Sequence, residues 1–272
     1  MAGSKPVSCL LASRAQALNR DSKPVIPKMR PIEVSNLHKS YGKTPALRGL
    51  TFAVSECEIY GLLGPNGAGK TTTLKILVGL LRPDYGSAKI CGYDVVRQRV
   101  KALELIGYVP ENPVCFQNLT VKEFLEFVGA LRRLDEEEVR EAVDYYLSIF
   151  DMSDKRDELV GNLSRGMIQK VLVSAAFMVR PRVLVMDEPM AGMDPEAQHA
   201  FKEEVRRLTS QGVAALISSH LLDMVERFCT RVGIINEGVL VAEGTVEEVK
   251  RRAESGEEAT LEEVFLKLVG ES

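Results

Sequence analysis

Hydrophobic residues along the chain change their spacing several times, and each change predicts a different element. From Ile32, in PIEVSNLHKSYG and PALRGLTFAVSECEIYGLLG, apolar and polar positions alternate and then merge into an apolar run over 59–63. Alternation is typical of strands with one buried face, and a short apolar run is typical of a strand buried on both faces. The sequence therefore predicts an antiparallel patch that leads into a buried strand.

Two helices are predicted in the middle of the chain, each opened by a capping-box pattern. Thr120 with Glu123 opens VKEFLEFVGALRRL, and Asp135 with Glu138 opens EEEVREAVDYYLSIF. In the second helix, apolar residues at helical spacing form one face. They are Val139, Val143, Tyr146, Leu147 and Phe150. The pattern predicts an all-helical insert over about 112–165.

Strands and helices alternate after the insert. The apolar segments VLVMD and AALISS predict strands, and helices are expected to begin at Arg165, Pro195 and Leu221. The segment RVGIINEGVLVAEG predicts a hairpin that turns at 236–238. Alternating strands and helices imply a mainly parallel sheet with both faces covered, which is an α/β fold.

The two ends of the chain differ from its middle. Residues 1–31 combine several prolines with mostly basic charge, so a disordered leader is expected, with a targeting or interaction arm as the alternative. Residues 32–245 carry the α/β pattern as one domain, and 246–272 predict a helical tail. The tail helices have capping pairs, Thr245 with Glu248 and Thr260 with Glu263.

Composition narrows the function classes. The 272 residues carry a net charge of −3, without the basic excess that nucleic-acid-binding proteins usually show. The five cysteines are scattered without a CxxC pair, as expected for reduced thiols in a cytosol. No stretch approaches the ~20 uninterrupted apolar residues of a membrane-spanning helix, and no signal-peptide pattern is present. If the protein works at a membrane, something else is expected to hold it there.

The segment GPNGAGKT, residues 64–71, predicts a phosphate-binding loop because it fits G-x-x-x-x-G-K-[ST] between a buried strand and a helix. Its glycines let backbone N–H groups converge on phosphates. Lys70 can reach the β- and γ-phosphates, and the Thr71 hydroxyl can ligate Mg²⁺. A chance match in a turn is the alternative, which the flanking elements disfavour. The predicted nucleotide-binding residues here are Gly64, Pro65, Asn66, Gly67, Ala68, Gly69, Lys70, Thr71 and Thr72.

A pair of acids follows the apolar strand in RVLVMDEP. Such strand ends are where α/β sheets place their ligands. Asp187 is expected to hold Mg²⁺ through its water shell, and Glu188 is the candidate general base that polarises the attacking water. Helix-capping acids before a turn are the alternative interpretation, which the upstream phosphate loop disfavours.

The order of these motifs resembles the ATP-binding subunits of ABC transporters. A phosphate loop, a helical insert, the serine-led helix start LSRGM at 163–167 and the acid pair follow one another, and the resemblance runs from about Ile32 to the C-terminus. It implies a RecA-like P-loop NTPase core with a mainly parallel sheet, an N-terminal antiparallel β patch and the helical insert. It also implies an ATPase that uses ATP and Mg²⁺.

The resemblance assigns roles to further residues. In that family the serine and glycine matched by Ser164 and Gly166 close over the γ-phosphate held by a second subunit, arranged head to tail. Tyr41 matches the aromatic residue that stacks on adenine, and His220 matches the histidine that senses the γ-phosphate and steadies the attacking water. Asp194, in AGMDP, matches the loop through which the two subunits communicate. Taken alone, Tyr41 equally fits a core tyrosine, and SRG equally fits an ordinary helix cap.

Two positions depart from the family pattern. Arg165 and Met167 replace the first glycine and the glutamine of the usual LSGGQ. Glu111, in YVPENP, replaces the glutamine that contacts Mg²⁺; its carboxylate can still ligate that metal but repels an uncovered γ-phosphate. ATP binding without metal is therefore expected to be weaker than usual. These departures and the tail TLEEVFLKLVG resemble the branch that powers drug, antibiotic, polysaccharide or sodium exporters.

The resemblance implies a subunit that pairs with a second nucleotide-binding subunit, identical or homologous, and drives a separate integral membrane permease from the cytoplasmic face of the membrane. A soluble ABC-type ATPase acting on ribosomes or DNA is the alternative, but such proteins usually carry two cassettes or a long coiled-coil insertion. A P-loop kinase or GTPase would leave LSRGM unexplained. No nucleic-acid partner is expected.

Overall fold

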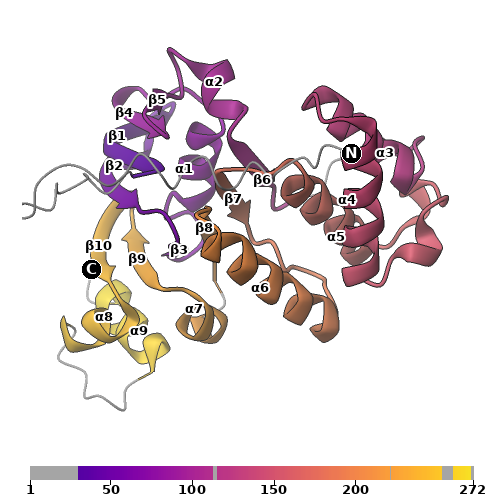
Figure 1. The fold of residues 1–272 in the computed structure, drawn as a ribbon. Helices are drawn as coiled ribbons and strands as arrows, with labels where there is room; N and C mark the ends of the chain where they lie inside the picture. The colour runs from indigo at the N-terminus through magenta and orange to yellow at the C-terminus, as the bar shows by residue number, and fades with distance from the viewer. Residues whose placement is uncertain (1–29, 113–114, 221, 253–259, 271–272) are drawn as a thin grey trace, which may run out of the picture.

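The computed structural model describes residues 30–112, 115–220, 222–252 and 260–270. Two sheets lie on either side of helix α1 (Lys70–Leu77), which packs against strands of both. The remaining large helices gather on the other side of the larger sheet (Figure 1). Residues 1–29 of the predicted leader lie outside the described residues. Leu221, where a helix was predicted to begin, also lies outside them.

The smaller sheet is antiparallel, with strand order β2-β1-β4-β5. Its strands are β1 (Ile32–Tyr41), β2 (Thr44–Val54), β4 (Tyr85–Ile90) and β5 (Tyr93–Asp94). Ile32 opposes Val54 on one side and Ile90 on the other, and all three side chains are fully buried. The antiparallel patch that alternation predicts is thus confirmed.

The larger sheet has the order β10-β9-β3-β8-β7-β6. Its strands are β3 (Ile59–Leu63), β6 (Ile106–Val109), β7 (Val183–Asp187), β8 (Ala214–Ser219), β9 (Arg231–Asn236) and β10 (Val239–Gly244). All neighbours are parallel except β9 and β10, which form the predicted hairpin. The mainly parallel sheet is confirmed, and it places the ends of β3, β7 and β8 side by side.

The central strands are buried on both faces, as their apolar runs predict. Tyr60 and Leu62 of β3 face α1 and the smaller sheet, whereas Ile59 and Leu63 face the opposite helical layer. Successive side chains of a strand point to opposite faces, so a strand covered on both sides needs apolar residues at every position. The sheet therefore holds the functional loops on a rigid, fully covered support.

The helices cover the larger sheet and form the insert. They are α1, α2 (Arg99–Leu103), α3 (Val121–Leu131), α4 (Glu136–Ile149), α5 (Arg165–Met178), α6 (Pro195–Ser210), α7 (Leu222–Phe228), α8 (Val246–Arg252) and α9 (Leu261–Gly270), with short 3₁₀ turns η2 (Ser153–Lys155) and η3 (Val160–Asn162). Helices α3 and α4 lie at one end of the molecule, away from the smaller sheet (Figure 1). The all-helical insert is thus present between β6 and α5.

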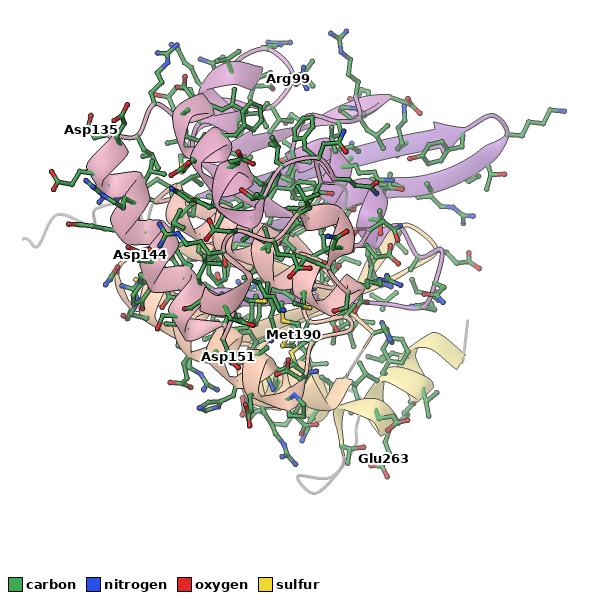
Figure 2. All side chains as sticks on the ribbon, turned by 90° about the vertical axis from the view of Figure 1, so that its right-hand side faces the viewer. Arg99, Asp135, Asp144, Asp151, Met190 and Glu263 are labelled. Atoms are coloured by element: carbon green, nitrogen blue, oxygen red, sulfur yellow. The ribbon has the colours of Figure 1, made fainter. Side chains whose placement is uncertain are left out.

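The predicted capping boxes have different outcomes. Thr120 and Glu123 exchange both bonds, and the pairs that begin at Thr245 and Thr260 do the same. The box predicted at Asp135 is wrong. This residue starts α4 at the surface (Figure 2) but makes no capping bond. Its intended partner Glu138 instead accepts a hydrogen bond of 2.8 Å from Arg180, across the insert–core boundary.

The insert is joined to the core by a buried carboxylate. Glu204 of α6 is 4% exposed and accepts hydrogen bonds from the hydroxyls of Tyr145 and Tyr146 on α4, each at 3.1 Å. Arg207 also donates to it, at 2.7 and 2.6 Å. Burial first, and then the Glu204 charge, raises the pKa of Tyr146. A change in the angle between insert and core would therefore strain these bonds.

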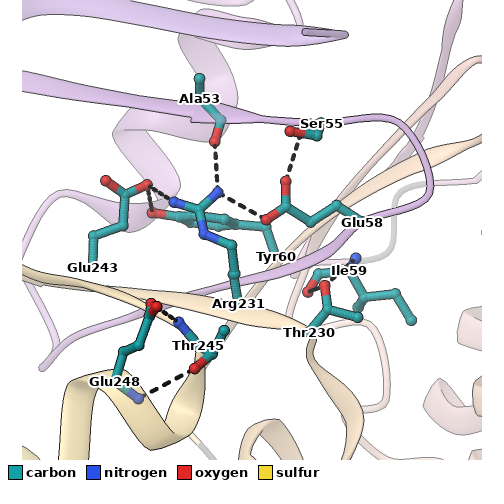
Figure 3. A network of polar contacts seen from close by, with 10 residues as sticks. All are labelled: Ala53, Ser55, Glu58, Ile59, Tyr60, Thr230, Arg231, Glu243, Thr245 and Glu248. Atoms are coloured by element: carbon teal, nitrogen blue, oxygen red, sulfur yellow. Dashed lines mark hydrogen bonds and ion pairs between the residues drawn. The ribbon is translucent and has the colours of Figure 1, made fainter. Parts of the chain in front are cut away.

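A second polar network ties the two sheets together (Figure 3). Arg231 of β9 donates to Glu58 at 2.8 Å and to Glu243 at 2.9 Å, and it reaches the Ala53 carbonyl of β2 at 3.5 Å. The Tyr60 hydroxyl also donates to Glu243, at 3.0 Å. Burial, followed by the Glu243 charge, raises the pKa of Tyr60 well above its usual value. The network fixes the sheet that carries the phosphate loop.

Candidate nucleotide site

The phosphate loop connects β3 to α1, and glycine is required at several of its positions. Gly67 and Gly69 have φ of +82° and +110°, in the left-handed region that favours glycine. A Cβ at Gly64 would lie 2.3 Å from the Ile235 carbonyl oxygen. The loop therefore wraps tightly before α1, whose first backbone N–H groups have no partner within the helix and point toward the loop.

Lys70 occupies the inside of this loop. It is 8% exposed, and its Nζ donates to the carbonyl oxygens of Gly64 at 2.6 Å and Pro65 at 3.0 Å. Burial lowers the pKa of Lys70, while the nearby carboxylates of Glu188, Asp187 and Glu111 oppose that shift. A buried ammonium held by two carbonyls at a helix N-terminus suits the binding of an anion.

The acid pair lies at the end of β7, next to the phosphate loop. Asp187 is 2% exposed and accepts a hydrogen bond from the Ser218 hydroxyl of β8. Glu188 follows with φ of +47°, a strained value for a residue with a Cβ. Its backbone N–H donates to the Ser218 carbonyl at 3.2 Å, which holds this conformation.

The Glu188 side chain is held by Ser219, the last residue of β8, and by His220, which follows it. His220 Nδ1 lies 2.7 Å from Glu188 Oε1, and the Ser219 hydroxyl donates to Oε2 at 3.4 Å. His220 remains largely exposed, whereas Glu188 is mostly buried. A carboxylate bonded to a histidine at the mouth of a cavity is an arrangement suited to general-base chemistry.

Most of the predicted site residues line one cavity of about 670 Å³. Those that do are Gly64, Pro65, Asn66, Gly67, Gly69, Lys70, Thr71, Thr72, Glu111, Asp187, Glu188 and His220. Ala68 is buried beneath the loop. Tyr41, at the end of β1, is 51% exposed and is not among the lining residues. The structure therefore brings together the candidate residues for phosphate binding, metal binding and general-base chemistry. They lie at or just after the ends of four parallel strands, β3, β6, β7 and β8.

The donor set of this cavity fits Mg²⁺. Thr71 offers a hydroxyl, Asp187 and Glu111 offer carboxylates, and all three residues line the same cavity. Mg²⁺ prefers oxygen ligands and is commonly held by one or two carboxylates together with substrate phosphates and water. Burial first, and then the charges of Asp187 and Glu111, raises the pKa of Tyr108 to about 12, so both carboxylates lie close enough to act on the same neighbouring group.

The LSRGM segment forms the start of α5. Ser164 is the N-cap, and its Oγ accepts the Met167 N–H at 3.3 Å. Gly166 is required within the chain as well, because a Cβ there would lie 2.1 Å from the Gly192 carbonyl oxygen. Ser164 and Gly166 are not among the residues lining the cavity, whereas Arg165 is.

The AGMDP loop is locked onto the same helix. Asp194 caps α6 by accepting the Ala197 N–H at 2.8 Å, and it forms an ion pair of 2.7 Å with Lys170 of α5. The hydrogen bond from Lys170, and then that from Ala197, lowers the pKa of Asp194. Gln169 donates to the Pro189 carbonyl at 3.0 Å. A displacement of the α5 start would therefore move the loop that follows Glu188.

Several residues that line the cavity or contact its acids were not predicted from the sequence to be site residues. They are Ser218, Ser219, Arg165, Ala191, Leu222 and Phe265. The two serines had a signal, since hydroxyls in the otherwise apolar strand AALISS must find a partner when buried. Phe265 had none, because its place beside the cavity depends on how α9 packs on α7.

A protein-family model described as ABC transporter matches residues 47–191, a range that includes the phosphate loop, the insert and the acid pair. The chain belongs to the ABC transporter family. It is an ATP-binding and ATP-hydrolysing subunit of that family, built on the P-loop NTPase fold.

Sequence and structural similarity to ATP-binding subunits of ABC transporters supports this assignment. The Nod factor export ATP-binding protein I of Burkholderia orbicola (strain AU 1054) is 40% identical over 214 residues, which is 79% of this chain and 70% of that protein. The linearmycin resistance ATP-binding protein LnrL of Bacillus subtilis (strain 168) is 34% identical over 79% of this chain and 69% of its own. A solved ATP-binding subunit of an ABC transporter is 32% identical, with a TM-score of 0.83 over 87% of this chain and 98% of that one.

In the described part of the ABC subunit, no helix combines the length and the apolar character that crossing a bilayer requires.

Proposed function

We propose that this ABC ATPase is the energy-coupling subunit of an exporter, and that it closes head to tail with a second nucleotide-binding subunit around two ATP molecules. The observation that carries the proposal is the position of Ser164. Its hydroxyl caps an exposed helix start, it is not among the residues lining the chain's own nucleotide cavity, and no described group accepts its proton. A phosphate of a second subunit suits that hydroxyl.

Each of the candidate site residues then has a distinct task. The phosphate loop and Lys70 bind the β- and γ-phosphates, and Tyr41 stacks on the adenine at the exposed end of β1. Mg²⁺, held through Thr71, Asp187 and Glu111, would neutralise charge on those phosphates. Glu188 accepts a proton from the attacking water, while His220 holds the Glu188 carboxylate and contacts the γ-phosphate.

Coupling to a permease follows from the connections of the insert. The insert begins after Glu111 at the cavity wall and ends at Ser164. Nucleotide in this cavity would therefore act on the first end, and nucleotide of the second subunit would act on the other. Division into an ATPase domain over 32–245 and a tail over 246–272 is part of the proposal. Closure and reopening of the two subunits would move the insert against the membrane protein.

The insert also presents an apolar patch, here defined as Phe116, Phe127 and Leu131. Phe116 and Phe127 pack edge to face at 5.4 Å, and Leu131 lies one helical turn from Phe127. The three side chains are 59%, 39% and 66% exposed. Contiguous exposed apolar surface marks interaction sites. We assign it to a cytoplasmic segment of the permease, which would hold the subunit at the cytoplasmic face of the membrane.

Export is the direction that the relatives favour, since they are named for Nod factor export and for linearmycin resistance. A pull-down of the tagged protein from gently solubilised native membranes, with mass spectrometry of the bound proteins, tests the assembly. We expect one multi-span membrane protein in near-stoichiometric amount. Recovery only from the soluble fraction, with ribosomes or without a membrane partner, would favour the soluble ATPase instead.

The apolar patch gives that pull-down a sharper form. Phe127→Glu is expected to reduce recovery of the membrane protein about tenfold or more, because a charge in a desolvated interface is costly. ATPase activity without the permease should be unchanged. Val100→Glu, on the 70% exposed side chain of α2, is the matched control and should retain the membrane protein. Equal recovery with both variants would place the permease elsewhere on the surface.

Ser164→Ala tests the role of the α5 start. ATP binding should persist, while turnover should fall by roughly a hundredfold to a thousandfold, as when one donor to developing charge is removed. Steady-state ATPase rates and calorimetric binding measure the two effects. Thr120→Ala is the control, since it removes a helix cap of similar worth, ~1 kcal/mol, away from any phosphate. Normal turnover in Ser164→Ala would contradict the shared-site proposal.

A further inference from the structure

The last residues of β7 and β8 form a buried pair beneath the nucleotide cavity. Asp187 and Ser218 are register partners in the parallel ladder, so their side chains project from the same face of the sheet. Ser218 is fully buried, and its hydroxyl donates to Asp187 Oδ1. Within the described residues, no donor is recorded for Asp187 Oδ2, while Asp187 lines the cavity.

A hydroxyl is an unusual choice at this position of the strand. Ala214 and Leu216 precede Ser218 on the same face and pack in the apolar core. Burying a hydroxyl in such surroundings costs free energy unless it is hydrogen-bonded, and a small apolar residue would fill the space without that cost. The partner that the structure records for the Ser218 hydroxyl is the carboxylate of Asp187.

We propose that Ser218 is a positioning residue for the Mg²⁺ ligand Asp187. This role rests on the function proposed above and is indirect, because Ser218 is not among the residues lining the cavity and acts through Asp187. By donating to Oδ1, Ser218 fixes the plane of the carboxylate, and Oδ2 would then be the oxygen left to hold Mg²⁺ or a water bound to it. Hydrogen-bond partners of ligating carboxylates orient the ligand, and their loss typically weakens metal binding by 10–100-fold.

The Ser218 backbone extends the same role to the base. Its carbonyl accepts the Glu188 N–H at 3.2 Å, and this bond helps hold Glu188 in its left-handed conformation. Ser218 thus orients the Asp187 carboxylate through its hydroxyl and holds the Glu188 backbone through its carbonyl. A side-chain substitution removes the first contact and keeps the second, so the metal effect is separable from the base.

The test is Mg²⁺-dependent binding of a fluorescent ATP analogue, N-methylanthraniloyl-ATP, to the full chain. In Ser218→Ala, the Mg²⁺ concentration that gives half-maximal tightening is expected to rise about tenfold. Binding in excess EDTA should match the unmodified protein, which also shows that the variant is folded. Ser174→Ala is the matched control: Ser174 is equally buried, but its hydroxyl donates within α5 to the Lys170 carbonyl at 2.9 Å. Its Mg²⁺ dependence should not move.

Ser218→Thr and Ser218→Val form a second pair that does not depend on filling a cavity. They have the same shape and both favour strands, but only threonine keeps the hydroxyl. Threonine should restore the unmodified Mg²⁺ dependence and valine should reproduce the alanine shift, even where alanine fails to fold. Identical Mg²⁺ dependence in the two variants would overturn the inference.

The outcome also separates this inference from the proposed function. Normal Mg²⁺ dependence in Ser218→Ala and Ser218→Val, beside a clear dependence in the unmodified protein, would overturn the role of Ser218 alone. Absence of any Mg²⁺ effect in the unmodified protein would overturn the proposed metal site and the inference together.

Discussion

A Lys70→Ala protein is expected to lose tight ATP binding, with Kd rising by roughly a hundredfold or more. The reason is that the Lys70 ammonium is buried inside the phosphate loop, where it bonds two carbonyls and is positioned to bond phosphate oxygens. A hydrogen bond to a charged group contributes about 1.5–3 kcal/mol, and Lys70 would lose at least one such bond to each of two phosphates. Isothermal titration with Mg-ATP measures the loss.

The same helix supplies the control for Lys70→Ala. Lys75 lies on α1 as well, but it is exposed and does not line the cavity. Lys75→Ala removes the same charge from the same element and should leave Kd within about twofold, because exposed charges are screened by solvent. If both variants bound ATP as the unmodified protein does, the loop would not be the nucleotide site.

A Glu188→Gln protein is expected to bind ATP normally, to hydrolyse it about a hundredfold to ten-thousandfold more slowly, and to accumulate as a closed dimer. A general base contributes about this much to a rate. Glutamine has the same shape and can keep the contact with His220, which the carboxylate makes at 2.7 Å. Because hydrolysis is what reopens the pair, slow hydrolysis traps it. Light scattering coupled to size exclusion, with and without Mg-ATP, measures the dimer.

Two combined variants make the dimer experiment decisive. Adding Lys70→Ala to Glu188→Gln should return the protein to monomer by removing ATP binding. Adding Ser164→Ala should weaken the dimer while ATP binding remains, since Ser164 would act on the phosphate of the other subunit. A Glu188→Gln protein that binds ATP but stays monomeric would contradict the head-to-tail arrangement. Loss of ATP binding equal to that of Lys70→Ala would show that Glu188 has a structural role.

Local patterns were enough to predict the elements and most of the cavity. The phosphate loop, the acids after β7 and the histidine after β8 each stand at the end of an apolar run. In a parallel sheet such ends meet at one edge, and this is where Lys70, Glu188 and His220 lie. The capping box at Thr120 was predictable for a similar reason, because its partners are three residues apart.

The features that the sequence predicted wrongly or did not predict share a physical cause, which is contact with residues distant in the sequence. Glu138 accepts a hydrogen bond from Arg180 and does not cap the start of its own helix. Arg180 is within reach because α4 packs against α5. In the sequence, Gly166 indicates a close approach of the backbone to an anion. In the structure, the nearby Gly192 carbonyl already excludes any side chain at this position. Phe265 reaches the cavity because α9 packs on α7.

The sequence by itself identified the candidate groups for the chemistry, because the loop, the acids and the histidine depend on short segments with their own backbone requirements. Only the tertiary structure decided how those groups are held. The register of β7 against β8 pairs Asp187 with Ser218, although 31 residues separate them. Strand register is set by the packing of both sheet faces, which no short segment encodes.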